Sequence, residues 1–346
     1  MLYLIINFKM SFEFTFLGSG LGTSRGLVNL LKRLRNKRIK KKINIGVIDQ
    51  DLNNFTGGIA YTKSLSEHGF LNNPARLCPQ EFIKWVINRD NSNLLLKKTK
   101  LSKSQSYKKW VKENEKILLK SKSINDQDEI YYPRFFLSQW LQNIITRELN
   151  LKRKNIEVRF INGKAVSIKK KNKKLIIFLD KGKKIKNSSF IKKNKYKILE
   201  DKKEILSKKI LISLGLPESK NPYGKDLSND KFFVPDLYNS GGTQKILNLI
   251  KKKKLKKIIK IHFLGTKAGF LECLPEISNL IKMKKIKLKL IATSSNATTL
   301  QPALKSKNYK KYYFKFLKKQ NLKKINTPEK LFKNIIKEFE AAKKNS

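Results

Sequence analysis

The chain has 346 residues, a length that accommodates two domains of about 150 residues each. Hydrophobic residues make up 40% of it and aromatic residues 10%, which excludes a disordered polar chain. Its 79 Lys and Arg residues outnumber its 26 Asp and Glu residues, and the formal net charge is +53.

Lysine supplies most of this charge, and it is spread along the chain among Ile and Asn residues. Arginine, whose planar guanidinium suits base edges and phosphates better, is scarce. We therefore expect compositional drift more than a dedicated nucleic-acid surface. Weak, salt-sensitive binding to polyanions is still expected.

The two cysteines, Cys78 and Cys273, lie far apart and lack CxxC spacing, so neither a disulfide framework nor a zinc site is predicted, and no metal ligands are assigned. The apolar start of the chain is interrupted by Lys9, which makes it too short for a membrane span or a secretion signal. We expect residues 1–10 to be an N-terminal extension of a cytoplasmic protein.

The first predicted unit is a strand, a glycine turn, a helix and a second strand. Residues 12–17 are apolar and aromatic, and the sequence Gly18-Ser19-Gly20-Leu21-Gly22-Thr23 follows at once. Apolar residues then recur at helical spacing from Leu27 to Leu34. The next apolar run, 43–48, is closed by Asp49. Such a unit places both strands in one parallel sheet.

The middle of the chain changes character twice. Residues 82–150 follow a mostly helical pattern, whereas residues 156–180 contain short strands that predict an antiparallel β excursion. Lysine runs between 169 and 209 are expected in hairpins and loops. Residues 209–214 are predicted as a strand that returns to the first sheet.

A second strand, glycine turn, helix and strand occupies residues 258–292, with Gly265 in the turn. The expected fold is α/β: a Rossmann-like domain with a mainly parallel sheet in three layers, an inserted antiparallel β excursion, and a second Rossmann-like unit. We expect a first domain over 11–220, a second over 221–305, and a Lys-rich helical tail over 306–346.

The first glycine turn has the chemistry of a pyrophosphate site. Glycine lets the backbone approach a phosphate, and the helix N-terminus offers free N–H groups. Thr23 stands at the usual third glycine position, so an ordinary structural turn is an alternative. Asp49 could accept hydrogen bonds from ribose hydroxyls, or it could be a solvated strand end. Together these features predict an adenine dinucleotide.

Residues beyond Asp49 carry a sharper resemblance. The sequences Gly57-Gly58-Ile59-Ala60-Tyr61 and Leu71-Asn72-Asn73-Pro74-Ala75-Arg76, followed by Tyr132-Pro133-Arg134 and by Leu214-Gly215-Leu216-Pro217, resemble a bacterial family of FAD/NAD(P)-binding proteins. That family is similar to FAD-dependent urate hydroxylases and, more distantly, to N-hydroxylating monooxygenases of ornithine and lysine. The resemblance covers residues 11–305 and implies a relative shortened at its C-terminus.

The resemblance implies FAD as the cofactor, with NAD(P)H as a second one. It places FAD at Gly18, Ser19, Gly20, Leu21, Thr23, Asp49 and Gln50, and near Gly215. It places Asn72, Pro74 and Ala75 along the flavin, and NAD(P)H at Gly265 and Thr266. Arg134 is expected either to contact the pyrophosphate or to anchor the following helix. Lys267 replaces the second glycine of the NAD(P)H turn, which would block close backbone approach there, although its ammonium could pair with a phosphate.

These features predict a FAD-dependent oxidoreductase that uses NAD(P)H, with hydroxylation of a small molecule as the implied subclass. Its substrate is not predicted. One alternative is a dinucleotide-binding sensor or partner-binding protein without turnover, which Lys267 favours. A weaker alternative is a basic protein that binds polyanions through its lysine surface.

Overall fold

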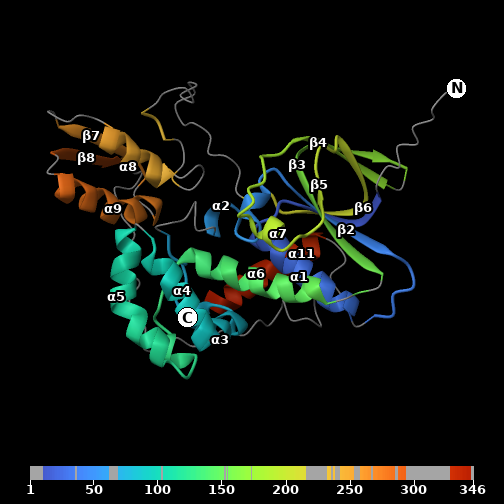
Figure 1. The fold of residues 1–346 in the computed structure, drawn as a ribbon, viewed down its shortest axis with the longest axis horizontal. Coiled ribbons are helices and arrows are strands. Elements are labelled where there is room, and N and C mark those ends of the chain that lie inside the picture. The colour runs from blue at the N-terminus through green and yellow to red at the C-terminus, as the bar shows by residue number, and fades with distance from the viewer. Residues whose placement is uncertain are drawn as a thin grey trace. The chain divides into compact units, whose positions relative to one another are not determined.

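The computed structural model of the chain is shown in Figure 1. It describes residues 11–35, 37–61, 69–102, 104–151, 153, 155–172, 174–215, 232–234, 237, 242–252, 258–265, 268–284, 287–293 and 328–343. The chain divides into two compact units, residues 1–298 and 299–346, and each is described by itself.

The predicted strand, turn, helix and strand are present as β1 (Ser11–Leu17), α1 (Leu21–Arg35) and β2 (Ile43–Asp49). β1 and β2 pair in parallel, from Phe14 opposite Ile45 to Leu17 opposite Ile48. The helical spacing of apolar residues in α1 buries one face of the helix, with Leu27 and Leu31 fully inaccessible.

A helical layer follows β2. It contains the short helix α2 (Gly58–Tyr61) and the longer helices α3 (Gln80–Ile87), α4 (Arg89–Lys100), α5 (Gln105–Lys120) and α6 (Arg134–Asn150). Side-chain caps begin two of them, because Asn88 accepts from the N–H of Asn91 and Ser104 accepts from that of Tyr107. Aromatic side chains fill the core between the helices, and Figure 1 shows α6 running beside α1.

The predicted antiparallel excursion is confirmed, although it begins later than expected. β3 (Ile156–Lys171) first pairs in parallel with β2, as far as Asp49 opposite Asn162. From Gly163 it pairs antiparallel with β4 (Lys174–Lys181). The first half of β3 carries the buried residues Phe160 and Ile161 and therefore joins the core, whereas its second half is lysine-rich and exposed.

The returning strand is β6 (Glu204–Ile212), which pairs in parallel with β1 as predicted and antiparallel with β4. The helix α7 (Phe190–Lys193) and the short strand β5 (Ile198–Leu199) precede it. The six strands are ordered β2-β1-β6-β4-β3-β5, with a further pairing between β2 and β3. This mostly parallel sheet is the core of a Rossmann-like α/β domain, and the carboxyl ends of β1, β2 and β6 meet at one edge.

The second predicted unit is also present. It consists of α8 (Gly242–Lys252), β7 (Ile259–Leu264), α9 (Ala268–Lys284) and β8 (Leu288–Thr293), with β7 parallel to β8. The buried side chains of Ile250, Phe263, Cys273 and Ile277 form its core. Figure 1 shows both helices packed along the two strands.

The unit 299–346 is described only over α11 (Pro328–Lys343), so the division into domains and the Lys-rich helical tail over 306–346 remain predictions. No helix within the described ranges is long and apolar enough to cross a membrane. Residues 1–10 lie outside those ranges, so the N-terminal extension remains a prediction.

Candidate functional site

The backbone of Gly18 is held between two neighbouring strands. Its N–H donates to the carbonyl of Ile48 at the end of β2, at 2.8 Å, and its φ of +92° lies in the left-handed region. A Cβ on Gly18 would overlap the carbonyl oxygen of Ser213, which follows β6. Glycine is therefore required here by the fold itself, because three strand ends converge on this point.

Thr23 accounts for the missing third glycine. Its side chain is fully buried, and its hydroxyl donates to the carbonyl of Gly18 at 2.7 Å. The turn is thus closed by a side-chain hydrogen bond. α1 begins directly after it, with the N–H of Ser24 donating to the carbonyl of Gly20 at 3.0 Å. The preceding N–H groups have no intrahelical acceptor and give the turn a positive partial charge.

Asp49 lies beside this turn, where the sequence places it. One carboxylate oxygen accepts from the N–H of Ser19 at 2.6 Å and the other from the N–H of Asp51 at 2.7 Å. The side chain is partly exposed. Each carboxylate oxygen can accept more than one hydrogen bond, so Asp49 can order the turn and still bind ribose hydroxyls.

A segment that the sequence did not assign to the turn packs against it. The N–H of Thr56 donates to the carbonyl of Ser19 at 2.8 Å. A Cβ built on Gly58 would lie 3.3 Å from the Cα of Gly20, and Gly58 has a φ of +54°. The Gly57-Gly58 sequence therefore permits a close approach of two backbones. A coenzyme at the turn would have to lie beside Gly58.

Two buried hydroxyls at the turn lack a hydrogen-bond partner. The side-chain oxygens of Ser19 and Ser24 are both inaccessible, and neither has a donor or an acceptor among the residues that the structure describes. An unsatisfied buried hydroxyl costs free energy, which a ligand oxygen could recover. These hydroxyls, the glycine backbone and the free N–H groups fit a pyrophosphate, and the acid at the end of β2 fits a ribose.

The other expected FAD contacts of the first domain lie around this edge. Leu21 opens α1 and packs partly against the helical core. Gln50 is exposed, and its carbonyl accepts from the N–H of Lys183 at 2.7 Å. Gly215 has a φ of +79° and open space where a Cβ would be. None of these positions shows by itself what it binds.

Arg134 connects the expected flavin stretch to the second unit. Its buried guanidinium donates to the carbonyl of Phe70 at 2.8 Å, to the side chain of Asn72 at 3.2 Å, and to Glu272 of α9 at 2.8 Å. Ala75 is tied to the helical core through a hydrogen bond to the Ile130 carbonyl. Arg134 thus anchors its surroundings, and contact with a pyrophosphate remains a prediction.

Pro74 precedes the short 3-10 helix η2 (Ala75–Leu77) and gives its start an extended backbone. Together with Asn72 and Ala75 it forms a loop that Arg134 and the residues before α6 hold in place. Proximity of this loop to a flavin remains a prediction.

The second glycine turn is open on one side. Gly265 has a φ of +96°, its N–H donates to the Thr293 carbonyl at 2.6 Å, and no atom of the described residues lies within 4 Å of a Cβ built on it. It follows β7, beside the carboxyl end of β8, which is where a parallel unit binds ligands. Thr266 and Lys267 lie outside the described residues.

A family model described as FAD-NAD(P)-binding matches residues 16–191, which include the glycine turn, Asp49 and Arg134. The chain belongs to this FAD-NAD(P)-binding family. A search of curated proteins finds no match. The family assignment and the Rossmann-like fold show a domain that binds FAD, NAD(P) or both, and the resemblance to hydroxylases is not part of that result.

Sequence reasoning missed the residues that pack on the turn. Thr56, Gly58 and Ser213 all contact it from other segments. The pair Gly57-Gly58 was visible as a motif, and its glycines were the available signal. Ser213 contributes through its backbone, which no sequence pattern marks.

Proposed function

We propose that the protein is a FAD-dependent oxidoreductase that takes electrons from NAD(P)H and acts on a small molecule, with hydroxylation as its reaction class. The observation that carries the proposal is the position of Asp49, whose carboxylate meets the turn after β1 within the segment that matches the family. A carboxylate at the end of the second strand is the group that binds an adenosine ribose in such units.

The residues around the turn have distinct roles in this proposal. Gly20 gives the pyrophosphate room to approach the backbone, and the N–H groups at the start of α1 receive its negative charge. The buried hydroxyls of Ser19 and Ser24 would have to turn toward the ligand to donate to phosphate oxygens. Asp49 accepts from the ribose hydroxyls while it retains its bond to the N–H of Ser19. The protein thereby positions the coenzyme, and the bound flavin supplies the redox chemistry.

We assign NAD(P)H to the turn at Gly265. Support comes from its left-handed backbone, the empty space beside it, and its position at the carboxyl ends of two parallel strands. The contact between Arg134 and Glu272 then gives a physical connection from this unit to the loop of Asn72. That connection would hold the two cofactor regions in a fixed relation.

A visible absorption spectrum of the purified protein tests the proposal. We expect flavin absorption bands, and we expect them to bleach when NADH or NADPH is added without oxygen. Reoxidation by air in the presence of a true substrate would then yield a hydroxylated product. A protein that cannot take up FAD would contradict the proposal.

A second candidate function is dinucleotide sensing without turnover, which Lys267 favours. In a turn of this type, a side chain at the second glycine position would take the space through which a pyrophosphate approaches the backbone. Flavin that binds but is never reduced by NADH or NADPH would select this function. The Lys267→Gly variant tests whether the lysine is the cause. If Lys267 blocks NAD(P)H binding, the flavin of this variant should become reducible by NADH or NADPH.

A further inference from the structure

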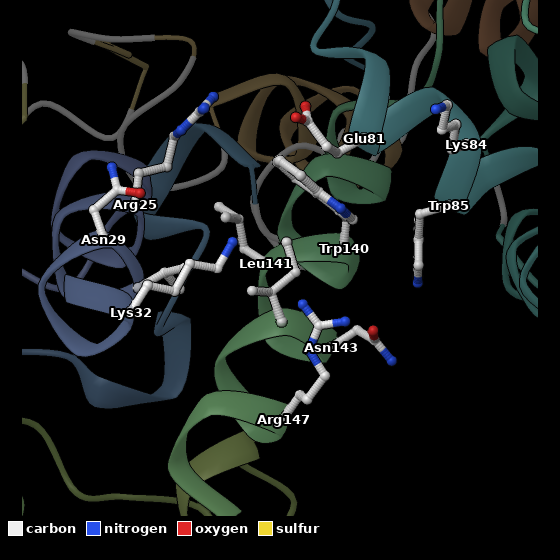
Figure 2. Close-up of a pocket in the computed structure, with 12 residues that line it drawn as sticks. Arg25, Asn29, Lys32, Glu81, Lys84, Trp85, Trp140, Leu141, Asn143 and Arg147 are labelled. Carbon is white, nitrogen blue, oxygen red and sulfur yellow. The ribbon is translucent and has the colours of Figure 1, made fainter. Parts of the chain in front are cut away.

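A pocket of about 400 Å³ lies between α1, α3 and α6, and Figure 2 shows its lining side chains. Its volume falls within the usual range of small-molecule sites, about 300–1,000 Å³. None of its lining residues belongs to the glycine turn or to the loop of Asn72. It is therefore a separate cavity from the coenzyme site described above.

The pocket is strongly cationic. Arg25, Lys32, Lys84 and Arg147 line it, against one lining carboxylate, Glu81. None of these four cations forms a salt bridge with any residue that the structure describes. Uncompensated positive charge around a concave surface attracts an anion. A lysine-rich surface alone does not explain two of the chain's few arginines at one pocket.

Two indole rings line the pocket together with the aliphatic side chains of Val28, Leu141 and Ile144. Trp140 is buried and carries the guanidinium of Arg25 over its ring, 5.8 Å from the ring centre. Trp85 is partly exposed, and its indole N–H is inaccessible without a hydrogen-bond partner. A planar ligand could stack on the exposed part of the Trp85 ring.

Two of the four cations, Lys32 and Arg147, lie at one end of the pocket, whereas Arg25 and Lys84 lie toward the end that holds Glu81. In Figure 2 the side chains of Lys32 and Arg147 point toward Leu141, whereas Glu81 lies at the opposite end. An anionic group fits best beside Lys32 and Arg147, away from the carboxylate. Amino or imino N–H groups of a planar base fit beside Glu81, because a carboxylate accepts hydrogen bonds from them.

We propose that this pocket binds a nucleoside phosphate, with the phosphate at Lys32 and Arg147 and the base between Trp85 and Glu81. The site requires an anion, a flat ring and N–H donors on one molecule, and nucleotides combine all three. The proposal goes beyond flavin binding and does not depend on it.

Titration calorimetry with GDP tests this site, because GDP is not a fragment of FAD or NAD(P). FAD is added only until the coenzyme site is saturated, so that this site does not take up the probe and no free FAD competes with GDP for the pocket. The variants are Lys32→Gln with Arg147→Gln, and separately Trp85→Phe, which leaves a smaller aromatic ring for stacking. The matched control is Lys116→Gln with Lys120→Gln, which removes two exposed charges from α5.

GDP should bind saturably to the unmodified protein and quench its tryptophan fluorescence. The Lys32 and Arg147 double variant should weaken GDP binding about tenfold or more, the Trp85 variant about threefold or more, and the control less than about twofold. Inorganic pyrophosphate should bind at least about tenfold more weakly than GDP, because it lacks a ring to stack on Trp85.

Three results would overturn the proposal: no saturable binding at millimolar GDP, an equal loss in the α5 control, or pyrophosphate binding as tight as GDP that is unaffected by Trp85→Phe. Thermal unfolding of each variant checks that it folds. Trp140 is left unchanged because it is part of the helical core. If the double variant fails to fold, Trp85→Phe still decides, because unchanged GDP binding there contradicts the assigned ring position.

Discussion

Gly18 and Gly20 stand two residues apart but are required for different reasons. A side chain on Gly18 would overlap the Ser213 carbonyl and would need a left-handed backbone. We expect Gly18→Ala to lower the free energy of unfolding by about 2–4 kcal/mol. Among the described residues, a Cβ on Gly20 would meet only the Cα and the backbone N of Gly58, at 3.7 and 3.8 Å, which are ordinary contacts. Gly20→Ala should therefore cost less than about 1 kcal/mol but lose FAD, because its methyl group fills the space of a phosphate oxygen.

Urea denaturation and flavin titration separate these two effects. The free energy of unfolding should fall in Gly18→Ala, and the affinity for FAD should fall in Gly20→Ala. A Gly20→Ala protein that retains full FAD affinity would show that the pyrophosphate lies elsewhere.

At this scale the sequence predicted the right turn but only part of its chemistry. Gly18, Gly20, Thr23 and Asp49 all belong to one predicted βαβ unit, so their proximity in space could be predicted from that unit. The hydrogen bond from Thr23 to Gly18 is also local, yet the missing third glycine gave no indication of it. The contacts of Thr56 and Ser213 could not be predicted, since they depend on how distant backbones meet.

Glu157 connects three strands through its charge. It pairs with Arg159 on β3 at 3.0 Å, with Lys197 before β5 at 2.7 Å, and with Lys42 before β2 at 3.0 Å. Its side chain is only 14% exposed. The hydrogen bonds from Arg159, then Lys197 and Lys42, hold the pKa of this carboxyl well below its ordinary value of 4.5.

We expect Glu157→Gln to destabilise the protein by about 1–2 kcal/mol at pH 7. Because the folded-state pKa is lowered, this contribution is present above the unfolded-state pKa and is lost as the pH falls through the folded-state value. The difference between the two proteins should therefore shrink from about pH 5 downward. Thermal or urea unfolding over that range measures it. A difference that stays constant with pH would contradict the ionic origin.

Glu129→Gln is the matched control for Glu157→Gln. Its side chain is 54% exposed and pairs with Arg76 at 3.1 Å. Exposed pairs contribute little, so we expect less than about 0.5 kcal/mol at any pH. A comparable loss in both variants would indicate a general charge effect.

The elements were largely predictable because their apolar patterns are strong. A short apolar run in the sequence marks each of the strands β1, β2, β6 and β7, and apolar residues at helical spacing mark α1. β3 was mistaken for a purely antiparallel strand, since its pairing changes from β2 to β4 at Gly163 with no break in the strand. Strand partners are chosen by tertiary packing, which local patterns do not record.

For the molecule as a whole, the net charge of +53 predicts weak binding to any polyanion. Binding to duplex DNA should fall by roughly 10³-fold or more between 50 and 200 mM salt, because it depends on counterion release. Fluorescence anisotropy with a labelled duplex measures this. Tight binding that persists at high salt would favour a dedicated nucleic-acid surface over compositional drift.

The central claim is that Asp49 binds the adenosine ribose of FAD beside the turn at Gly18. Titration of the apoprotein of Asp49→Ala with FAD and with FMN tests it most directly, because FMN lacks the adenosine. Asp180→Ala, which removes an exposed strand carboxylate, is the control. We predict FAD affinity about 10–100-fold weaker in Asp49→Ala, unchanged FMN affinity, and no effect of the control. Equal weakening of FAD and FMN, or full FAD affinity in Asp49→Ala, would contradict the account.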